Sequence, residues 1–132
     1  MEDLRNYRSA LGKFATGVAI ATVWAEDMTP VGLTINSFTS VSLEPPIILW
    51  SLRSNSPSLG AFEKSEHFSI NILSSDQIDI STKFAKPGRK FDGLESPDTC
   101  LQAPVIKGCP TAMLCRKIEA HLSGDHVVFF GE

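Results

Sequence analysis

The sequence has few cysteines, and they lack the spacings with which cysteine usually builds a structural site. Cys100, Cys109 and Cys115 are odd in number and form no C-x-x-C pair. A disulfide framework or a metal site is therefore not expected. A reducing, cytoplasmic setting is expected instead. The amino terminus carries Glu2 and Asp3 and no apolar run, so it does not have the pattern of a signal peptide.

Long hydrophobic runs and an excess of positive charge are also missing. The longest apolar stretches, such as 45–50, are far shorter than the roughly 20 residues of a membrane span. Without such a span, no membrane partner is expected. Twelve basic and fifteen acidic residues give a net charge of -3 without a basic patch, so no nucleic-acid partner is expected. The sequence has no Ser-His-Asp pattern, Walker loop or G-x-G-x-x-G, which argues against a hydrolase, a P-loop enzyme and a Rossmann dehydrogenase.

What the chain does contain is a series of short segments with strand periodicity. Its 132 residues have the size of a single domain. Helical spacing predicts an amphipathic helix over 3–15, and capping residues predict two further helices over 56–66 and 76–85. Strand patterns occupy 18–23, 31–38, 46–52, 67–73, 114–122 and 127–130. Many short strands with a few helices predict a mainly β fold with peripheral helices, of α+β or barrel type.

Two segments are expected to need something outside the regular fold. Residues 92–111 are rich in Pro, Gly and Asp, which predicts a surface excursion of the kind that forms a flap or contacts a partner. The strand over 127–130 is followed only by two residues. We expect it to leave an open edge, covered either by missing carboxyl-terminal strands or by a partner subunit.

Short polar side chains occur among strong strand formers between Gly32 and Pro46. Buried without partners, each would cost about 1–3 kcal/mol, so water or a polar ligand must satisfy them. A solvated strand with a Ser/Thr-rich turn is the alternative. A second polar cluster, 51–58, ends at a predicted helix start, which favours either an anion or simple helix capping.

Four motifs follow one another along the chain: Arg8-x-x-Leu11-x-x-Phe14-x-Thr16-Gly17-Val18; Gly32-x-Thr34-x-Asn36-Ser37-Phe38-Thr39-Ser40-Val41-Ser42-Leu43-Glu44-Pro45-Pro46; Phe84-Ala85 with Phe91-Asp92-Gly93; and Gly124-Asp125-His126-x-x-Phe129-x-Gly131-Glu132. In order and spacing they resemble the flavin reductase-like family of FMN-binding split barrels. The resemblance covers essentially the whole chain. It implies one split β-barrel domain over 1–132, apparently truncated at the carboxyl terminus, because family members continue for a few more strands.

The resemblance also implies an activity and a set of site residues. The activity is NAD(P)H-dependent reduction of FMN, or of FAD, with NADH or NADPH as hydride donor. The reduced flavin would pass to a separate, transiently bound monooxygenase, and the chain would form a homodimer. The implied flavin-binding residues are Thr34, Ile35, Asn36 and Ser37 at the ring, and Ser40, Val41, Ser51, Leu52, Arg53, Ser56, Ala85 and Lys86 towards the ribityl chain and phosphate. His126 would position the nicotinamide.

Blander interpretations stand beside these assignments. Lys86 has the sequence context of a solvated lysine at a helix end, and His126 that of a turn histidine facing solvent. Trp50 is expected in the core, although it directly precedes the second polar cluster. The alternative function is an FMN-binding electron-transfer or carrier protein that does not oxidise NAD(P)H. A barrel that binds no flavin is the third possibility.

Overall fold

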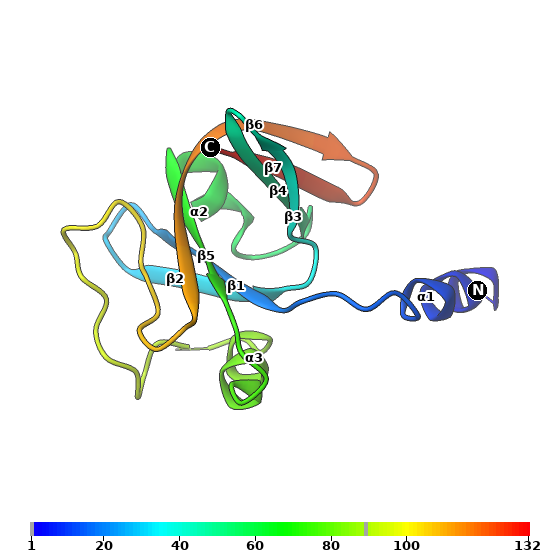
Figure 1. The fold of residues 1–132 in the computed structure, drawn as a ribbon, viewed down its shortest axis with the longest axis horizontal. Helices are drawn as coiled ribbons and strands as arrows, with labels where there is room; N and C mark the ends of the chain where they lie inside the picture. The colour runs from blue at the N-terminus through cyan, green and yellow to red at the C-terminus, as the bar shows by residue number, and fades with distance from the viewer. Residues whose placement is uncertain (1, 89) are drawn as a thin grey trace.

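The computed structural model describes residues 2–88 and 90–132, and it is built around one seven-stranded antiparallel sheet (Figure 1). The order across the sheet is β2-β1-β5-β6-β7-β4-β3. The strands are β1 (Ala19–Trp24), β2 (Pro30–Ile35), β3 (Thr39–Leu43), β4 (Pro46–Arg53), β5 (His67–Ile72), β6 (Thr111–Ser123) and β7 (His126–Gly131). Three short helices, α1 (Glu2–Leu11), α2 (Leu59–Lys64) and α3 (Ile78–Phe84), complete the described elements. The predicted mainly β fold with peripheral helices is confirmed.

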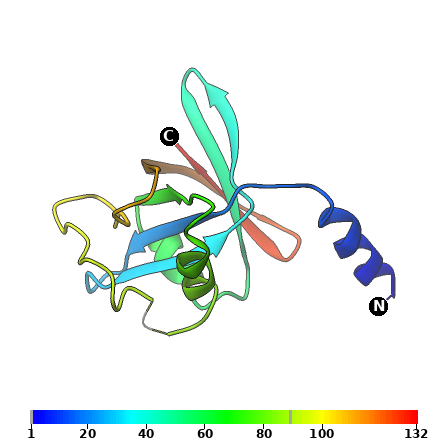
Figure 2. The same ribbon diagram turned by 60° about the horizontal axis from the view of Figure 1, so that its bottom comes forward.

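The long strand β6 divides the sheet into two halves. Its residues from Thr111 to Arg116 pair with β5, and those from Lys117 to Ser123 pair with β7. The register shifts between Lys117 and Glu119, where the strand passes from one half to the other. One half is therefore β2-β1-β5 and the other is β7-β4-β3, and the β3–β4 hairpin stands away from β1 and β2 (Figure 2).

The expectation of an uncovered final strand is wrong. β7 pairs with β6 on one side and with β4 on the other, through residues 126–131 in both ladders. The strands at the ends of the order are β2 and β3. The error has a plain cause, because alternation along a strand shows which residues are buried and not which strands lie beside it.

Aromatic side chains fill the core between the two halves. Trp50 packs against Phe62, Phe68 and Phe129, with ring centroids 4.9, 5.8 and 5.0 Å apart. All four are almost fully buried, so the expectation that Trp50 lies in the core is confirmed. Gly131 allows the last strand to pass over this cluster, because a Cβ atom there would lie 2.5 Å from Phe68 Cζ.

Part of the segment predicted as a surface excursion is fixed to the core. The hydroxyl oxygens of Thr22 and Ser69 lie 2.5 and 2.6 Å from the carbonyl oxygen of Pro104. The Ile106 amide donates to Asn71 Oδ1 at 2.9 Å. All these residues are buried, so each polar group needs its partner. Residues 103–106 are therefore anchored to β1 and β5 rather than forming a flap.

The helix boundaries differ from those expected. Ser56 does not cap α2; its hydroxyl accepts the Ser58 amide at 3.2 Å in the turn before the helix begins. The residue before α3 is Gln77, and Asp76 contacts Ser74 instead. α2 has six residues, and Ser58, which precedes it, makes no side-chain cap hydrogen bond. Among the described residues, no helix is long and apolar enough to cross a membrane.

Candidate functional site

A cavity of about 420 Å³ lies where the two half-sheets meet, between the end of β2 and the end of β4. We call it the polar cavity. It is lined by Leu33, Thr34, Ile35, Asn36, Ser37, Ser51, Leu52, Arg53, Asn55, Ser56, Pro57 and His126. The lining joins the first polar cluster of the sequence, the second polar cluster and the start of the last strand.

The polar cavity contains most of the residues implied for the flavin site. The structure brings together Thr34, Ile35, Asn36, Ser37, Ser51, Leu52, Arg53, Ser56 and His126. It does not bring Ser40, Val41, Ala85 or Lys86 into this lining. Ser40 and Val41 are exposed on β3, whose hairpin with β4 turns away from β2, and Ala85 and Lys86 are exposed after α3.

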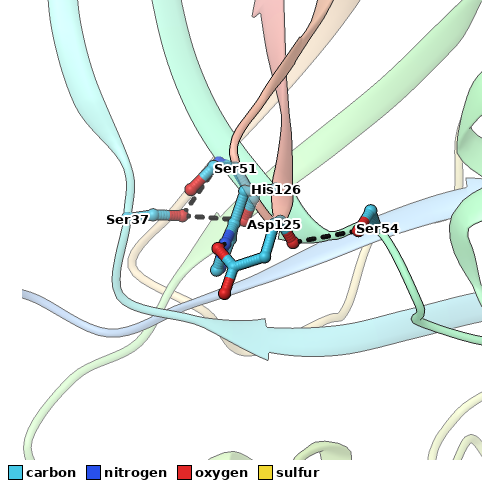
Figure 3. Close-up of polar contacts among 5 residues, drawn as sticks. All are labelled: Ser37, Ser51, Ser54, Asp125 and His126. Atoms are coloured by element: carbon cyan, nitrogen blue, oxygen red, sulfur yellow. Dashed lines mark hydrogen bonds and ion pairs between the residues drawn. The ribbon is translucent and has the colours of Figure 1, made fainter. Parts of the chain in front are cut away.

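A single serine connects the two walls of the polar cavity. Ser37 follows β2, and its hydroxyl donates to the Ser51 carbonyl oxygen at 3.1 Å and accepts the Ser51 amide at 3.0 Å (Figure 3). These two bonds join the end of one half-sheet to the middle of β4 in the other. We call this contact the seam. Its hydroxyl proton is used within the protein, so Ser37 offers a ligand only an oxygen lone pair.

The remaining polar groups of the cavity divide into fixed and available ones. The Thr34 hydroxyl donates to the Ser81 carbonyl oxygen of α3 at 2.6 Å, so this proton also serves the fold. Asn36, Arg53 and Asn55 are exposed, and their side chains make no hydrogen bond to another described residue. An amide on one wall and a guanidinium and an amide on the other are thus available to a ligand.

His126 lies at the rim, held by the turn that precedes β7. Its Nδ1 is 2.7 Å from Asp125 Oδ1, and the hydrogen bond from His126 lowers the pKa of the Asp125 carboxyl (Figure 3). The carbonyl oxygen of Asp125 accepts the Ser54 amide at 2.9 Å and the Ser54 hydroxyl at 3.1 Å. With Nδ1 engaged, the Nε2 atom is the ring nitrogen left for a ligand.

A second cavity, of about 590 Å³, continues along β2 from the first and shares Pro57 with it. We call it the proline-lined cavity. Its lining comprises Thr29, Pro30, Val31, Gly32, Pro57, Ser58, Pro87, Gly88, Lys90, Phe91 and Asp92. The Lys90 ammonium donates to the Gly32 carbonyl oxygen at 3.0 Å, and burial lowers the pKa of Lys90.

The sequence motifs explain how Lys90 reaches β2, although sequence reasoning missed it. Phe91 packs edge-on against Phe84, with ring centroids 5.0 Å apart. Phe84 in turn lies over Gly32, where a Cβ atom would be only 2.8 Å from Phe84 Cε1. The paired motifs Phe84-Ala85 and Phe91-Asp92-Gly93 therefore fold the chain back over β2. The signal that could have found Lys90 is its position directly before Phe91.

A larger hollow of about 830 Å³ lies elsewhere, between the turn after β1, α2 and the segment around Leu101. It contains none of the predicted site residues, and Glu26 and Lys64 at its edge form an exposed ion pair at 3.7 Å. Across 2–88 and 90–132, no three His, Cys, Asp or Glu side chains are grouped so that they would hold a metal ion.

Comparison with known proteins agrees with this geometry. A family model described as the flavin reductase like domain matches residues 11–132. The chain is 43% identical over 131 residues to "FMN reductase (NADH) SmoA" of Agrobacterium fabrum, covering 99% of this chain and 75% of SmoA. It is 38% identical over 133 residues to the reductase component of the flavin-dependent trigonelline monooxygenase of Acinetobacter baylyi, covering 100% of this chain and 43% of that protein. The chain thus spans less than half the length of this second relative.

The solved structure of the NADH:FAD oxidoreductase SgcE6 from Streptomyces globisporus C-1027 matches with a TM-score of 0.90 at 30% identity, over 99% of this chain and 80% of that one. The antiparallel sheet in two halves, with a polar cavity where they meet, has the arrangement that the resemblance to split barrels implied. Within the class of split barrels, the chain belongs to the flavin reductase-like family. The predictions of the family and of a flavin reductase type of enzyme are confirmed.

Proposed function

We propose that this chain transfers a hydride from NADH or NADPH to FMN or FAD, with the flavin ring bound in the polar cavity. The observation that carries the proposal is the lining itself. Apolar side chains of Leu33, Ile35 and Leu52 stand beside the available polar groups of Asn36 and Arg53. A flat ring with one polar edge needs such a mixed wall.

The bound flavin supplies the hydride acceptor and the nicotinamide supplies the hydride, so the protein needs no acid or base of its own. The residues of this chain bind and orient. Asn36 would meet the carbonyls and nitrogens of the ring edge, and Arg53 and Ser56 would lie towards the ribityl chain. His126, fixed by Asp125, would position the nicotinamide at the rim. Holding two reactants in a fixed relative orientation is the main contribution that a protein makes to such a transfer.

The phosphate end is proposed to lie along β2 in the proline-lined cavity. Lys90 is a partly buried cation that lines this cavity, whereas Lys86 is exposed and outside both linings. A cation with lost hydration gains more from an anionic partner than one in water. We therefore propose Lys90 for the role that the sequence pattern implied for Lys86.

The biological use is proposed to be the supply of reduced flavin to a separate monooxygenase. The trigonelline relative is named as the reductase component of such a system, and a solved structure of SgcE6 contains NAD and FAD fragments. We also propose that the chain acts as a homodimer in the cytoplasm. Three cysteines without a disulfide are compatible with that reducing compartment.

Turnover distinguishes a reductase from a flavin carrier. Under anaerobic conditions, a catalytic amount of the protein mixed with FMN in large excess over protein, and NADH in excess over FMN, should bleach all the flavin while one NADH is consumed for each flavin reduced. The same mixture with FAD and with NADPH measures both preferences. Bleaching of one equivalent of flavin or less per chain would support the carrier and contradict the reductase.

A further inference from the structure

The amino-terminal residues 2–18, which we call the arm, extend away from the rest of the chain in both views (Figures 1 and 2). Every residue from Asp3 to Val18 is exposed. The apolar residues predicted to form one helical stripe are among them: Leu4, Tyr7, Leu11 and Phe14 are 53%, 62%, 56% and 78% exposed. Turn hydrogen bonds from Gly12, Lys13 and Phe14 continue the stripe past the end of α1.

Such a helix is not stable by itself. Isolated helices shorter than about 12–15 residues are marginal in water, and α1 has ten residues. In proteins the stability of a short amphipathic helix comes from packing its apolar face against another surface. The stripe of the arm therefore requires a covering surface that the extended chain does not provide.

The total exposed area sets an upper bound on how much surface a second copy could cover. The chain exposes 8413 Å². A compact monomer of 14.4 kDa is expected to expose about 6,800 Å², so the excess is about 1,600 Å² per chain. Two chains that each cover this excess would bury about 3,200 Å² together, which lies within the range of about 2,000–5,000 Å² for obligate homodimers.

A second copy of the chain also offers apolar surface. Outside the arm, strongly exposed apolar side chains occur on the half-sheet β7-β4-β3 and the adjoining end of β6, at Leu43 and Leu122 among others. A two-fold arrangement lets each arm use the other copy in the same way, so both stripes are covered by one operation.

We propose that the arm packs its apolar stripe on a second copy of this chain, in a reciprocal exchange that holds the dimer together. This inference rests on the proposed homodimer and adds the element that forms it. It is independent of the flavin chemistry. The arm leaves the barrel at Ala19, which pairs with Ile35, so the exchanged segment begins beside the polar cavity.

Sedimentation equilibrium of the full chain and of two matched double variants tests the proposal. Leu11→Ser with Phe14→Ser removes part of the stripe, and Asn6→Ala with Ser9→Ala changes the opposite face of the same helix. Since neither pair touches the core, both variants should keep the β-sheet circular dichroism of the parent, and only the stripe variant, which leaves α1 without a covering surface, should lose helical signal. The parent and the control should sediment at twice the chain mass, and the stripe variant should dimerise at least about a hundredfold more weakly.

The outcomes separate the arm from the dimer. A parent that sediments as a monomer overturns both proposals. A stripe variant that dimerises as tightly as the parent overturns the arm exchange and leaves the homodimer standing.

Trypsin cleavage at Arg8 and Lys13 distinguishes exchange from an arm that folds back. Protection that appears only as the parent dimerises supports exchange. Protection that persists below the concentration at which sedimentation shows the parent to be monomeric means that the arm covers its own chain, and no protection in the dimer means that it is free. Either of these last two results contradicts the proposal.

Discussion

His126 owes its place to its neighbours rather than to its own burial. The hydrogen bond to Asp125 and the two bonds from Ser54 to the Asp125 carbonyl fix the ring at the rim of the polar cavity. Because its remaining ring nitrogen is proposed to meet the nicotinamide and not the flavin, His126→Ala should leave FMN affinity unchanged. It should lower kcat/KM for NADH by about tenfold or more, or about 1.4 kcal/mol of transition-state binding. Steady-state kinetics beside a fluorescence titration with FMN measure the two quantities.

Two further variants sharpen this test. His126→Asn and His126→Gln keep a hydrogen-bonding group and should recover part of the activity. Loss of flavin binding in His126→Ala would place the residue at the flavin instead. Unchanged NADH kinetics would make it a turn residue.

We expect FMN affinity to depend on Lys90 and not on Lys86, although both lysines follow α3. Lys90→Gln keeps a donor for the Gly32 carbonyl oxygen but removes the charge. We expect it to weaken FMN binding by about ten- to a hundredfold, the range of a charge-assisted hydrogen bond, while riboflavin binding stays nearly constant. The control Lys86→Gln should change neither ligand. Equal losses for FMN and riboflavin in Lys90→Gln would mean that Lys90 supports the fold, and a selective loss in Lys86→Gln would restore the original assignment.

The hairpin between β6 and β7 is an element whose shape depends on one backbone conformation. Gly124 has φ +61° at the first position of its two-residue turn, as a type II′ turn requires. Gly124→Ala should destabilise the protein by about 1–2 kcal/mol. Gly60→Ala is the matched control, because Gly60 is in α2 with open space around it, and it should stabilise by about 0.5–1 kcal/mol. Urea denaturation gives both values, and equal effects of the two changes would contradict the argument.

Element by element, the sequence predicts the strands better than their connections. The alternation of residues 67–73 and 127–130 locates β5 and β7 closely. The predicted strand 31–38 runs past the end of β2, because Asn36 and Ser37 leave the strand where the neighbouring residues remain strong strand formers, and β3 is not predicted. Most of the polar cavity follows from the two polar clusters. Lys90 does not, because its approach depends on the Phe84–Phe91 contact, which joins loop and helix only in three dimensions.

The thiol of Cys115 is a probe of unfolding of the whole molecule, because it becomes accessible to solvent when the barrel opens. It is buried on β6, and burial raises the pKa of its thiol above the ordinary value to about 11. A group with a raised folded pKa contributes stability that is complete below its unfolded pKa and is lost as pH rises. The free energy of unfolding should therefore fall between pH 9 and 11, by at most about 1.4 kcal/mol per pH unit for this one proton.

Urea denaturation of the parent and of Cys115→Ala at pH 8, 9, 10 and 11 isolates that contribution. The variant should be less stable at pH 8, and its stability should fall less steeply than that of the parent. Parallel curves would contradict the argument. As an independent check, a thiol reagent at pH 8 should label exposed Cys100 rapidly and Cys115 only at the rate of unfolding.

The seam at Ser37 has a consequence for how tightly the barrel is held. The two half-sheets meet there through one side chain and not through a ladder, so the wall of the polar cavity is also a place where the barrel can part. A ligand that contacts Asn36 on one wall of the polar cavity and Arg53 on the other would link the two half-sheets at the seam. At a hundredfold excess over its Kd, such a ligand adds about 2.7 kcal/mol to the folded state. A chain that has released its flavin should therefore have a lower free energy of unfolding than the flavin-bound chain.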